Sequence, residues 1–140
     1  MMLGTSTESP FTPRWARWIA LLLLCSAYLQ GAIDKLLDVA GASAEMQHFG
    51  LAPAGAFVGV TIVFELVASA MVLSGVLRWL GALALAGFTI VAAFVANRFW
   101  DAVPPDRLML ANAFFEHWGL AGAFLLVAWH DLKARHDHSI

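Results

Sequence analysis

One acidic side chain, Glu65, lies inside a long apolar run of the sequence that extends from Pro53 to Arg78. At a helical rise of about 1.5 Å per residue, Glu65 lies roughly 18 Å from Pro53, near the middle of a hydrocarbon layer about 30 Å thick. An acidic group at the centre of a membrane helix costs about 2.5–3.5 kcal/mol on insertion scales. We therefore expect Glu65 to face other helices or a wet cavity, either within a functional pocket or only as a hydrogen-bonding group between helices.

More polar side chains lie near the ends of the other apolar segments. Because successive spans alternate in direction, these side chains reach the half of the layer above Glu65, and a polar pocket opening to the outer side is predicted. Asn112 and Glu116 are four residues apart and share a helical face. Arg98 is the natural partner for Glu116, and either Lys35 or a hydrogen bond of the protonated carboxyl serves Glu65, so the sequence does not assign these pairs. A purely structural ion-pair cluster is the alternative. The predicted pocket residues are Lys35, Glu65, Arg98, Asn112, Glu116 and His117.

The sequence offers little support for resident redox or metal chemistry. A b-type haem in a membrane needs two facing histidines, and His117 is the only histidine inside an apolar segment. Glu116 and His117 are adjacent, hence about 100° apart on a helix, and cannot easily bind one ion together. We therefore expect no metal site and no covalently bound cofactor. The only cysteine, Cys25, excludes an internal disulfide and is expected to be a packing residue.

The composition indicates a membrane protein. The chain has 140 residues, of which 61% are hydrophobic and only 13% are charged, and a soluble domain of this size needs more charge on its surface. Four spans of about 20 residues use nearly all of the length. The predicted fold is an all-α four-helix transmembrane bundle in contact with the lipid bilayer. A net charge of -2 gives no reason to expect a nucleic-acid partner.

Segment boundaries follow from hydropathy and from residues that end helices. Residues 1–13 are expected to be a disordered tail, 14–132 a four-span domain and 133–140 a polar C-terminal tail. The spans are predicted at 15–37, 53–74, 77–99 and 108–129, and cleavage of the first as a signal peptide is an alternative. Residues 38–52 are expected to be a loop with at most a short amphipathic piece. Gly75 is expected to end the second span in a left-handed conformation.

Glycine positions and the distribution of charge predict packing and orientation. The core is expected to pack through Gly55, Gly59, Gly81, Gly119 and Gly122, so that Gly59→Leu should be badly tolerated. Of the eight Lys and Arg residues, five fall on the side of both termini and three on the other side. This excess predicts that both termini are cytoplasmic, in a multi-pass protein of the cell inner (plasma) membrane.

Several short motifs occur in an order that resembles the DoxX family of small four-helix membrane proteins. Gln30-Gly31-Ala32-Ile33-Asp34-Lys35 looks like that family's glycine-x-x-x-lysine end of the first helix, and the segment from Glu65 to Gly75 is similar to its glutamate-led second helix. The loop Phe49-Gly50-Leu51-Ala52-Pro53, the triplet Phe99-Trp100-Asp101 and the run from Gly119 to Ala128 also fit. The resemblance covers almost the whole chain except its two tails.

The resemblance implies a role beside oxidoreductases, because family members are described as membrane subunits of thiosulfate:quinone oxidoreductase or as parts of oxidative-stress complexes. The leading prediction is a quinone-associated subunit or membrane anchor of such a system, in sulfur metabolism or oxidative stress. Its pocket would receive a quinone headgroup, and a soluble or membrane oxidoreductase partner would supply the electrons. We expect aromatic walls around the pocket from Phe64, Phe99, Phe115 and Trp118.

Other readings of the same residues stay open. A small proton-coupled transporter, in which Glu65 and Glu116 exchange protons with a substrate, is the main alternative. A non-catalytic membrane scaffold is another. Whether the chain forms a homo-oligomer, and whether it has enzymatic turnover alone, is left undecided by the sequence.

Overall fold

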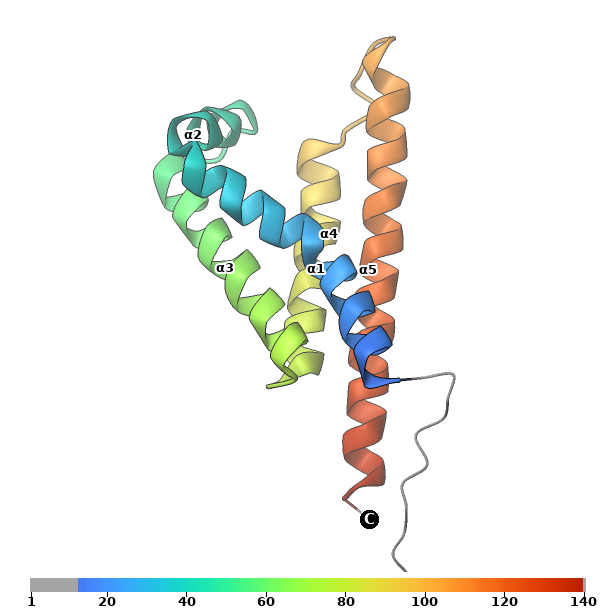
Figure 1. Ribbon diagram of the computed structural model, residues 1–140. Coiled ribbons are helices and arrows are strands. Elements are labelled where there is room, and N and C mark those ends of the chain that lie inside the picture. The colour runs from blue at the N-terminus through green and yellow to red at the C-terminus, as the bar shows by residue number, and fades with distance from the viewer. Residues whose placement is uncertain (1–12, 140) are drawn as a thin grey trace, which may run out of the picture.

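The computed structural model describes residues 13–139, and this part of the chain consists of helices and their connections (Figure 1). The helices are α1 (Arg14–Leu37), α2 (Val39–His48), α3 (Ala54–Ser74), α4 (Arg78–Ala96) and α5 (Asp106–Asp137). Four of them, α1, α3, α4 and α5, are long and apolar enough to cross a membrane, whereas α2 has only 10 residues. The prediction of an all-α chain with four long apolar helices is therefore confirmed. The predicted disordered tail lies outside the described residues, apart from Pro13.

The four long helices run alternately in opposite directions (Figure 1). α1 packs against α3, α3 against α4, and α4 against α5, while α2 packs on α3. The start of α1 and the end of α5 lie at the lower end of Figure 1, which we call the terminal end, and α2 lies across the opposite end, which we call the α2 end. The α1–α3 pair and the α4–α5 pair diverge toward the α2 end.

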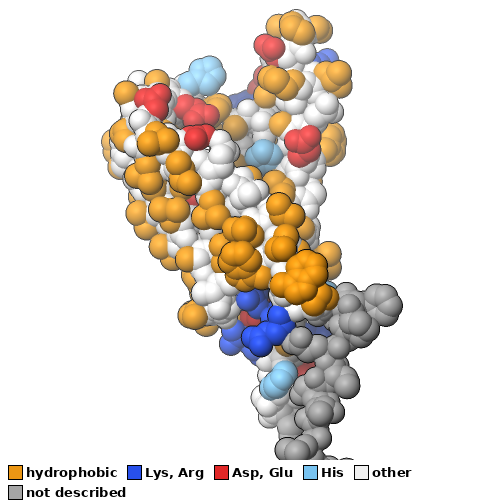
Figure 2. All heavy atoms as spheres, viewed as in Figure 1, with side chains coloured by type: hydrophobic (Ala, Val, Ile, Leu, Met, Phe, Trp, Pro, Cys, Tyr) orange, Lys and Arg blue, Asp and Glu red, His pale blue; other side chains and the backbone are white. Residues whose placement is uncertain are grey.

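Hydrophobic side chains cover the middle of the molecular surface. Figure 2 shows them across one face, with acidic side chains near the α2 end and Lys and Arg side chains gathered near the terminal end. Many large apolar side chains of the long helices are exposed, among them Val60 at 68%, Val63 at 61% and Leu23 at 69%. An apolar band bounded by charged residues at both ends matches the hydrocarbon layer and its two interfaces.

A helix occupies most of the segment 38–52, which was expected to be a loop with at most a short amphipathic piece. The Asp38 carboxylate caps α2 by accepting a hydrogen bond from the Gly41 backbone N–H at 2.8 Å. Ala42 and Met46 lie one turn apart and are both buried, on the side where α2 packs on α3. The cap and the burial together stabilise a short helix despite the low helix propensity of Gly41.

The turn between α3 and α4 is anchored by α5. Gly75 has a φ of +85° and ends α3 in the left-handed conformation that the sequence predicted. The Asp131 carboxylate of α5 accepts a hydrogen bond from the Trp79 backbone N–H at 3.2 Å and thereby caps the first turn of α4. Arg135 donates to the same carboxylate at 2.9 Å. These contacts explain why α5 stays helical through Asp137, past residue 133 where a polar tail was expected to begin.

Only one of the five glycines expected to pack the core lies at a close helix crossing. A Cβ on Gly81 would come within 2.8 Å of the Ala68 carbonyl oxygen and of the Met71 Cβ, so α3 and α4 touch there. The prediction is wrong for four exposed glycines, where a Cβ would meet nothing within 4 Å: Gly55, Gly59, Gly119 and Gly122. Gly59→Leu is consequently no longer expected to disrupt this chain.

The main apolar core joins α1, α3, α4 and α5 near the middle of the molecule. Val72, Leu85 and Phe124 are fully buried in it, and so is Cys25. The prediction that this cysteine is a packing residue is therefore confirmed.

Candidate functional site

A buried ion pair connects α1 to α3. The Lys35 Nζ lies 3.2 Å from the Glu65 Oε2 and 3.4 Å from its Oε1. The Glu65 side chain is 6% exposed and the Lys35 side chain 17% exposed, so both groups are largely withdrawn from their surroundings. Glu65 therefore faces other helices, as predicted, and Lys35 is its partner. Their attraction in a medium of low dielectric offsets part of the free energy lost with their hydration.

Gly31 provides the space in which this pair forms. Lys35 lies one turn after Gly31, and its ammonium folds back to donate a hydrogen bond to the Gly31 carbonyl oxygen at 3.1 Å. A Cβ on Gly31 would lie 3.2 Å from the Lys35 Nζ and 3.5 Å from the Glu65 Oε1. The spacing Gly31-x-x-x-Lys35 thus has a physical meaning, since any side chain at the first position would crowd the two charged groups.

The ion pair borders a cavity of about 520 Å³ between the α1–α3 and α4–α5 pairs. All five helices contribute to its wall, and α2 contributes at the α2 end. The volume lies in the range of about 300–1,000 Å³ that is typical of small-molecule sites. Most of the wall is apolar, with a small number of polar side chains, as is also typical of such sites. The polar lining residues are Tyr28, Lys35, Glu45, Thr61, Glu65, Thr89 and His117.

Tyr28 and Thr89 form a buried hydrogen bond between α1 and α4, two turns of α1 away from Lys35. The Thr89 hydroxyl donates its proton to the Leu85 carbonyl oxygen at 2.6 Å, so it accepts from the Tyr28 hydroxyl. The Tyr28 ring meets Phe88 and Phe124 edge-on, with centroid distances of 6.3 and 5.4 Å. Contacts of the ring and of the hydroxyl therefore both hold Tyr28 in place. Its hydroxyl proton is used in the bond to Thr89, so the Tyr28 oxygen can only accept a further hydrogen bond.

His117 reaches the cavity from α5 and is held by two neighbours. Its Nδ1 lies 2.7 Å from the Ala113 carbonyl oxygen, and because a carbonyl can only accept, Nδ1 carries the proton. The amide nitrogen of the buried Asn97, just after α4, lies 3.4 Å from Nδ1 and 3.5 Å from Nε2, and of the two only Nε2 can accept from it. In this arrangement His117 lines the cavity while its Nδ1–H is engaged by the Ala113 carbonyl oxygen.

Three of the six predicted pocket residues lie away from this cavity. Arg98 pairs with Asp101 at 2.6 Å in the exposed connection after α4, and not with Glu116 as expected, because a partner three residues away lies within easier reach. Asn112 and Glu116 do share a face of α5, but that face is exposed and borders a separate hollow. The reason is the step of about 100° between consecutive helical residues, which turns Glu116 outward when its neighbour turns inward. The cavity retains Lys35, Glu65 and His117 from the predicted set.

The predicted aromatic walls also lie elsewhere. Phe99, Phe115 and Trp118 gather around Phe114 in an aromatic cluster of α5 and the connection before it. Phe64 lines the apolar groove described below. The phenylalanine rings that line the cavity are Phe49, Phe57 and Phe88, beside Tyr28 and His117.

Sequence reasoning missed Tyr28, Thr89 and Glu45 as lining residues. A signal for the first was present, because Tyr28, Gly31 and Lys35 are spaced by three and four residues and therefore share one face of α1. No comparable spacing marks Thr89 or Glu45. Among the residues that the structure describes, no group of three or more His, Cys, Asp or Glu side chains is placed to hold a metal ion.

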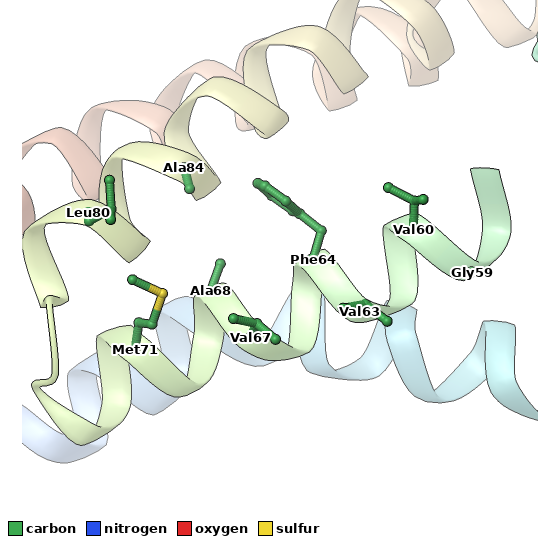
Figure 3. A pocket seen from close by; sticks show the side chains of 9 residues that line it. All are labelled: Gly59, Val60, Val63, Phe64, Val67, Ala68, Met71, Leu80 and Ala84. Carbon is green, nitrogen blue, oxygen red and sulfur yellow. The ribbon is translucent and has the colours of Figure 1, made fainter. Parts of the chain in front are cut away.

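A second hollow, of about 590 Å³, is an apolar groove between α3 and α4 (Figure 3). Val60, Val63 and Val67 of α3 line it together with Leu80 and Ala84 of α4. These side chains offer no polar group that could orient a substrate, and several belong to the exposed apolar band. The cavity beside Lys35 and Glu65 is therefore the better candidate for chemistry.

The fold and the site together define a class of protein. Four long apolar helices, charges at both ends and a buried ion pair within the apolar band identify a multi-pass helical membrane protein. The family model described as DoxX matches residues 16–98, more than half of the chain, and the chain belongs to the DoxX family. The matched segment spans nearly all of α1 through α4 and ends before α5, so it includes Lys35 and Glu65 but not His117. Neither a curated protein nor a solved structure matches the chain.

Proposed function

We propose that this DoxX-family membrane protein binds a quinone headgroup in the cavity beside Lys35 and Glu65. In this proposal it acts as a quinone-associated subunit or membrane anchor of an oxidoreductase system, in sulfur metabolism or oxidative stress. The observation that carries the proposal is a largely buried ammonium, paired with Glu65 by long contacts, at the edge of a mostly apolar cavity.

The Lys35 ammonium supplies the hydrogen bond that a quinone carbonyl requires. Its contacts with the two Glu65 oxygens, at 3.2 and 3.4 Å, are longer than the 2.7–2.9 Å or so that is usual for charge-assisted hydrogen bonds. The three N–H groups of Lys35 face the Gly31 carbonyl oxygen and the two Glu65 oxygens, so a ligand carbonyl would replace the longest of these contacts, at 3.4 Å, while Lys35 stays paired with Glu65 through Oε2. Tyr28 and His117 donate instead to Thr89 and Ala113, so Lys35 is the principal donor at this cavity.

The remaining wall suits a flat, apolar ring. Phe49, Phe57 and Phe88 supply aromatic contacts, and the two helix pairs diverge toward the α2 end, where an attached isoprenoid chain could reach lipid. A quinone, when bound, supplies two-electron redox chemistry. The apolar segments predicted from the sequence contain one cysteine and one histidine, so we assign the source of electrons to a partner oxidoreductase.

Binding of a short-chain quinone to the purified protein in nanodiscs tests this proposal. Tryptophan fluorescence quenching by decylubiquinone is the readout. Lys35→Met/Glu65→Gln removes both charges together, so that neither remains buried alone, and it should weaken binding at least about tenfold through the lost carbonyl hydrogen bond. Glu116→Gln is the matched control, because this exposed carboxylate lies outside the cavity and its loss should leave binding unchanged.

Equal quinone affinities for the parent and the double variant would refute the proposal. Loss of affinity in Glu116→Gln would instead show that the probe binds in the hollow beside Asn112. Extraction of the purified material for endogenous quinone, together with identification of copurifying proteins, addresses the partner oxidoreductase.

A proton-coupled transporter is the second candidate, favoured by the buried carboxyl of Glu65 beside a cavity. The scheme in which Glu65 exchanges protons with Glu116 has no geometric support, because Glu116 lies on the exposed face of α5. Proteoliposomes under a pH gradient separate the two candidates. Substrate-dependent proton flux that Glu65→Gln abolishes would favour the transporter, and its absence would favour the quinone-associated subunit.

A further inference from the structure

A hollow of about 940 Å³ lies at the terminal end of the molecule, at the opposite end from α2. It is formed by the first turns of α1, the start of α4 and the last turns of α5. Its charged and polar lining residues are Arg14, Arg17, Arg78, His130 and Asp131. Neither the ion pair nor the cavity beside it includes any of these residues.

The charge balance in this hollow is positive. Asp131 is the one acidic side chain among its described lining residues, and its carboxylate is already engaged by the Trp79 backbone N–H and by Arg135. Arg78 lies 3.9 Å from the same carboxylate and donates from Nε to the Val72 carbonyl oxygen at 2.8 Å. Three arginines therefore line the hollow together with a single carboxylate, which also serves other donors.

Arg14 and Arg17 contribute the least neutralised charges. Both are exposed, and within residues 13–139 neither forms an ion pair. They lie three residues apart and so share the side of α1 that borders the hollow. Each guanidinium group is a planar fork of N–H donors, which is suited to phosphate oxygens.

The wall of the hollow becomes apolar along α1 and α5. Ala16, Ala20 and Leu21 of α1 and Val127 of α5 line this part. Trp15 and Trp18, exposed at 67% and 51%, lie at the same turns of α1, as aromatic residues do at the membrane–water interface. The hollow thus has a basic part, lined by arginines, that continues into an apolar part.

We propose that this hollow binds an anionic phospholipid, with its phosphate between Arg14, Arg17 and Arg78 and one acyl chain along the apolar wall of α1 and α5. The arrangement matches basic pockets between membrane helices that take anionic headgroups. A free phosphate ion satisfies the arginines equally well but leaves the apolar wall uncovered, so the wall selects the lipid. This inference is independent of the quinone proposal, because the two hollows share no residue.

Titration of the delipidated full chain in detergent tests the proposal, with thermal stability and lipid retention in native mass spectrometry as readouts. The probes are dioctanoyl phosphatidylglycerol, dioctanoyl phosphatidylcholine and inorganic phosphate. The parent protein should bind the anionic lipid most tightly. Arg14→Gln/Arg17→Gln should bind it about 30-fold more weakly, as expected for two basic groups near an anionic headgroup. Because both side chains are exposed, the variant should retain the fold.

Arg98→Gln/Arg107→Gln is the matched control, since it removes the same charge from exposed positions near the α2 end and should leave lipid binding unchanged. Ala20→Phe fills the apolar part of the wall and should weaken binding of the lipid while phosphate binding stays the same. Equal lipid affinity in the parent and in Arg14→Gln/Arg17→Gln would overturn the proposal. So would an equal loss in the control variant, or phosphate binding as tight as that of the anionic lipid.

Discussion

Lys35 and Glu65 illustrate how two charged residues can lie within an apolar band only as a pair. Each loses hydration on burial, and each is compensated by the other at 3.2 Å. The compensation also explains why the sequence shows an isolated acid at mid-depth: its partner comes from the end of a different helix. The loss of one member of the pair should therefore be clearly visible in stability.

Removal of one partner should destabilise the protein far more than removal of both. Lys35→Met leaves Glu65 buried without its cation and should lower the free energy of unfolding by about 3–5 kcal/mol. Lys35→Met/Glu65→Gln should recover most of that loss. Thermal or SDS unfolding of the purified protein in detergent measures both variants.

The exposed Arg98–Asp101 pair serves as the control for this comparison, with side chains 58% and 55% exposed. Arg98→Gln should change stability by less than about 1 kcal/mol, because exposed pairs contribute little. Equal destabilisation by Lys35→Met and by the double variant would show that the two residues do not compensate each other.

Two glycines with opposite surroundings make a second test at the residue scale. Gly31→Val should destabilise the protein and displace the Lys35 ammonium, because a Cβ alone would already lie 3.2 Å from its Nζ. Gly59→Val should be nearly neutral, because a Cβ there would meet nothing within 4 Å. Parallel melting curves of the two variants, each with its expression yield, provide the comparison. A larger loss of stability for Gly59→Val than for Gly31→Val would contradict this prediction. It would indicate that Gly59 contacts something outside the single chain.

At the scale of helices, α5 organises the terminal end through one side chain. The Asp131 carboxylate caps α4 at the Trp79 backbone N–H. It also pairs with Arg78, the first residue of α4, and with Arg135, one turn further along α5. The connection between α3 and α4 is short and passes through Leu77, whose φ is +50°. An external cap is therefore the means by which the start of α4 is held.

Asp131→Ala should loosen the start of α4 without unfolding the protein. Loss of the cap should cost about 1–2 kcal/mol, with a smaller contribution from the two arginine contacts. Hydrogen exchange of the backbone amides at residues 78–81 should accelerate, since the first turn of α4 loses its acceptor. Asp137→Ala, an exposed residue at the end of α5, is the control and should leave exchange at α4 unchanged. Unaltered exchange in Asp131→Ala would show that the cap contributes nothing.

The short helix α2 is held in place by local contacts. Its ten residues are too few for a span, yet its cap at Asp38 and its buried Ala42 and Met46 hold it against α3 beside the cavity. A short helix that closes one end of a hairpin positions Glu45 at the cavity wall, which a loop of variable shape would not do reliably.

For the whole molecule, the excess of basic residues near the terminal end predicts how it lies in the membrane. Both termini should be cytoplasmic, and the connection between α4 and α5 should face the opposite side. Val103 in that connection is 73% exposed, and His136 near the end of α5 is also exposed. These two positions are suitable reporters of the two sides.

A membrane-impermeant maleimide measures this orientation in intact cells that lack an outer membrane barrier. In a Cys25→Ser background, Val103→Cys should be labelled from outside, and His136→Cys should be labelled only after permeabilisation. The reverse pattern would invert the orientation. It would also place the arginine-lined hollow in the outer leaflet and the cavity beside Lys35 in the inner half.

Much about this protein follows from the sequence alone, because hydropathy is a local property of the chain. The four long helices, the inward position of Glu65 and the left-handed end of α3 at Gly75 each depend on residue types within one segment. The resemblance to the DoxX family depends on the order of several such segments along the chain. Because an unpaired charge in hydrocarbon has a high free energy, membrane-spanning segments contain few charges and can be predicted from the sequence.

Which polar residues meet was decided only by the tertiary structure. Each step along a helix rotates a side chain by about 100°, so the choice of Glu116 or His117 for the cavity depends on how α5 is turned against α4. Arg98 could reach a local or a distant carboxylate, and the conformation of the connection after α4 brings Asp101, three residues away, within 2.6 Å. The same holds for the glycines, since their contacts depend on which helix lies opposite. Hydropathy determined that these helices are buried in a membrane, whereas their rotation about their own axes determined the site.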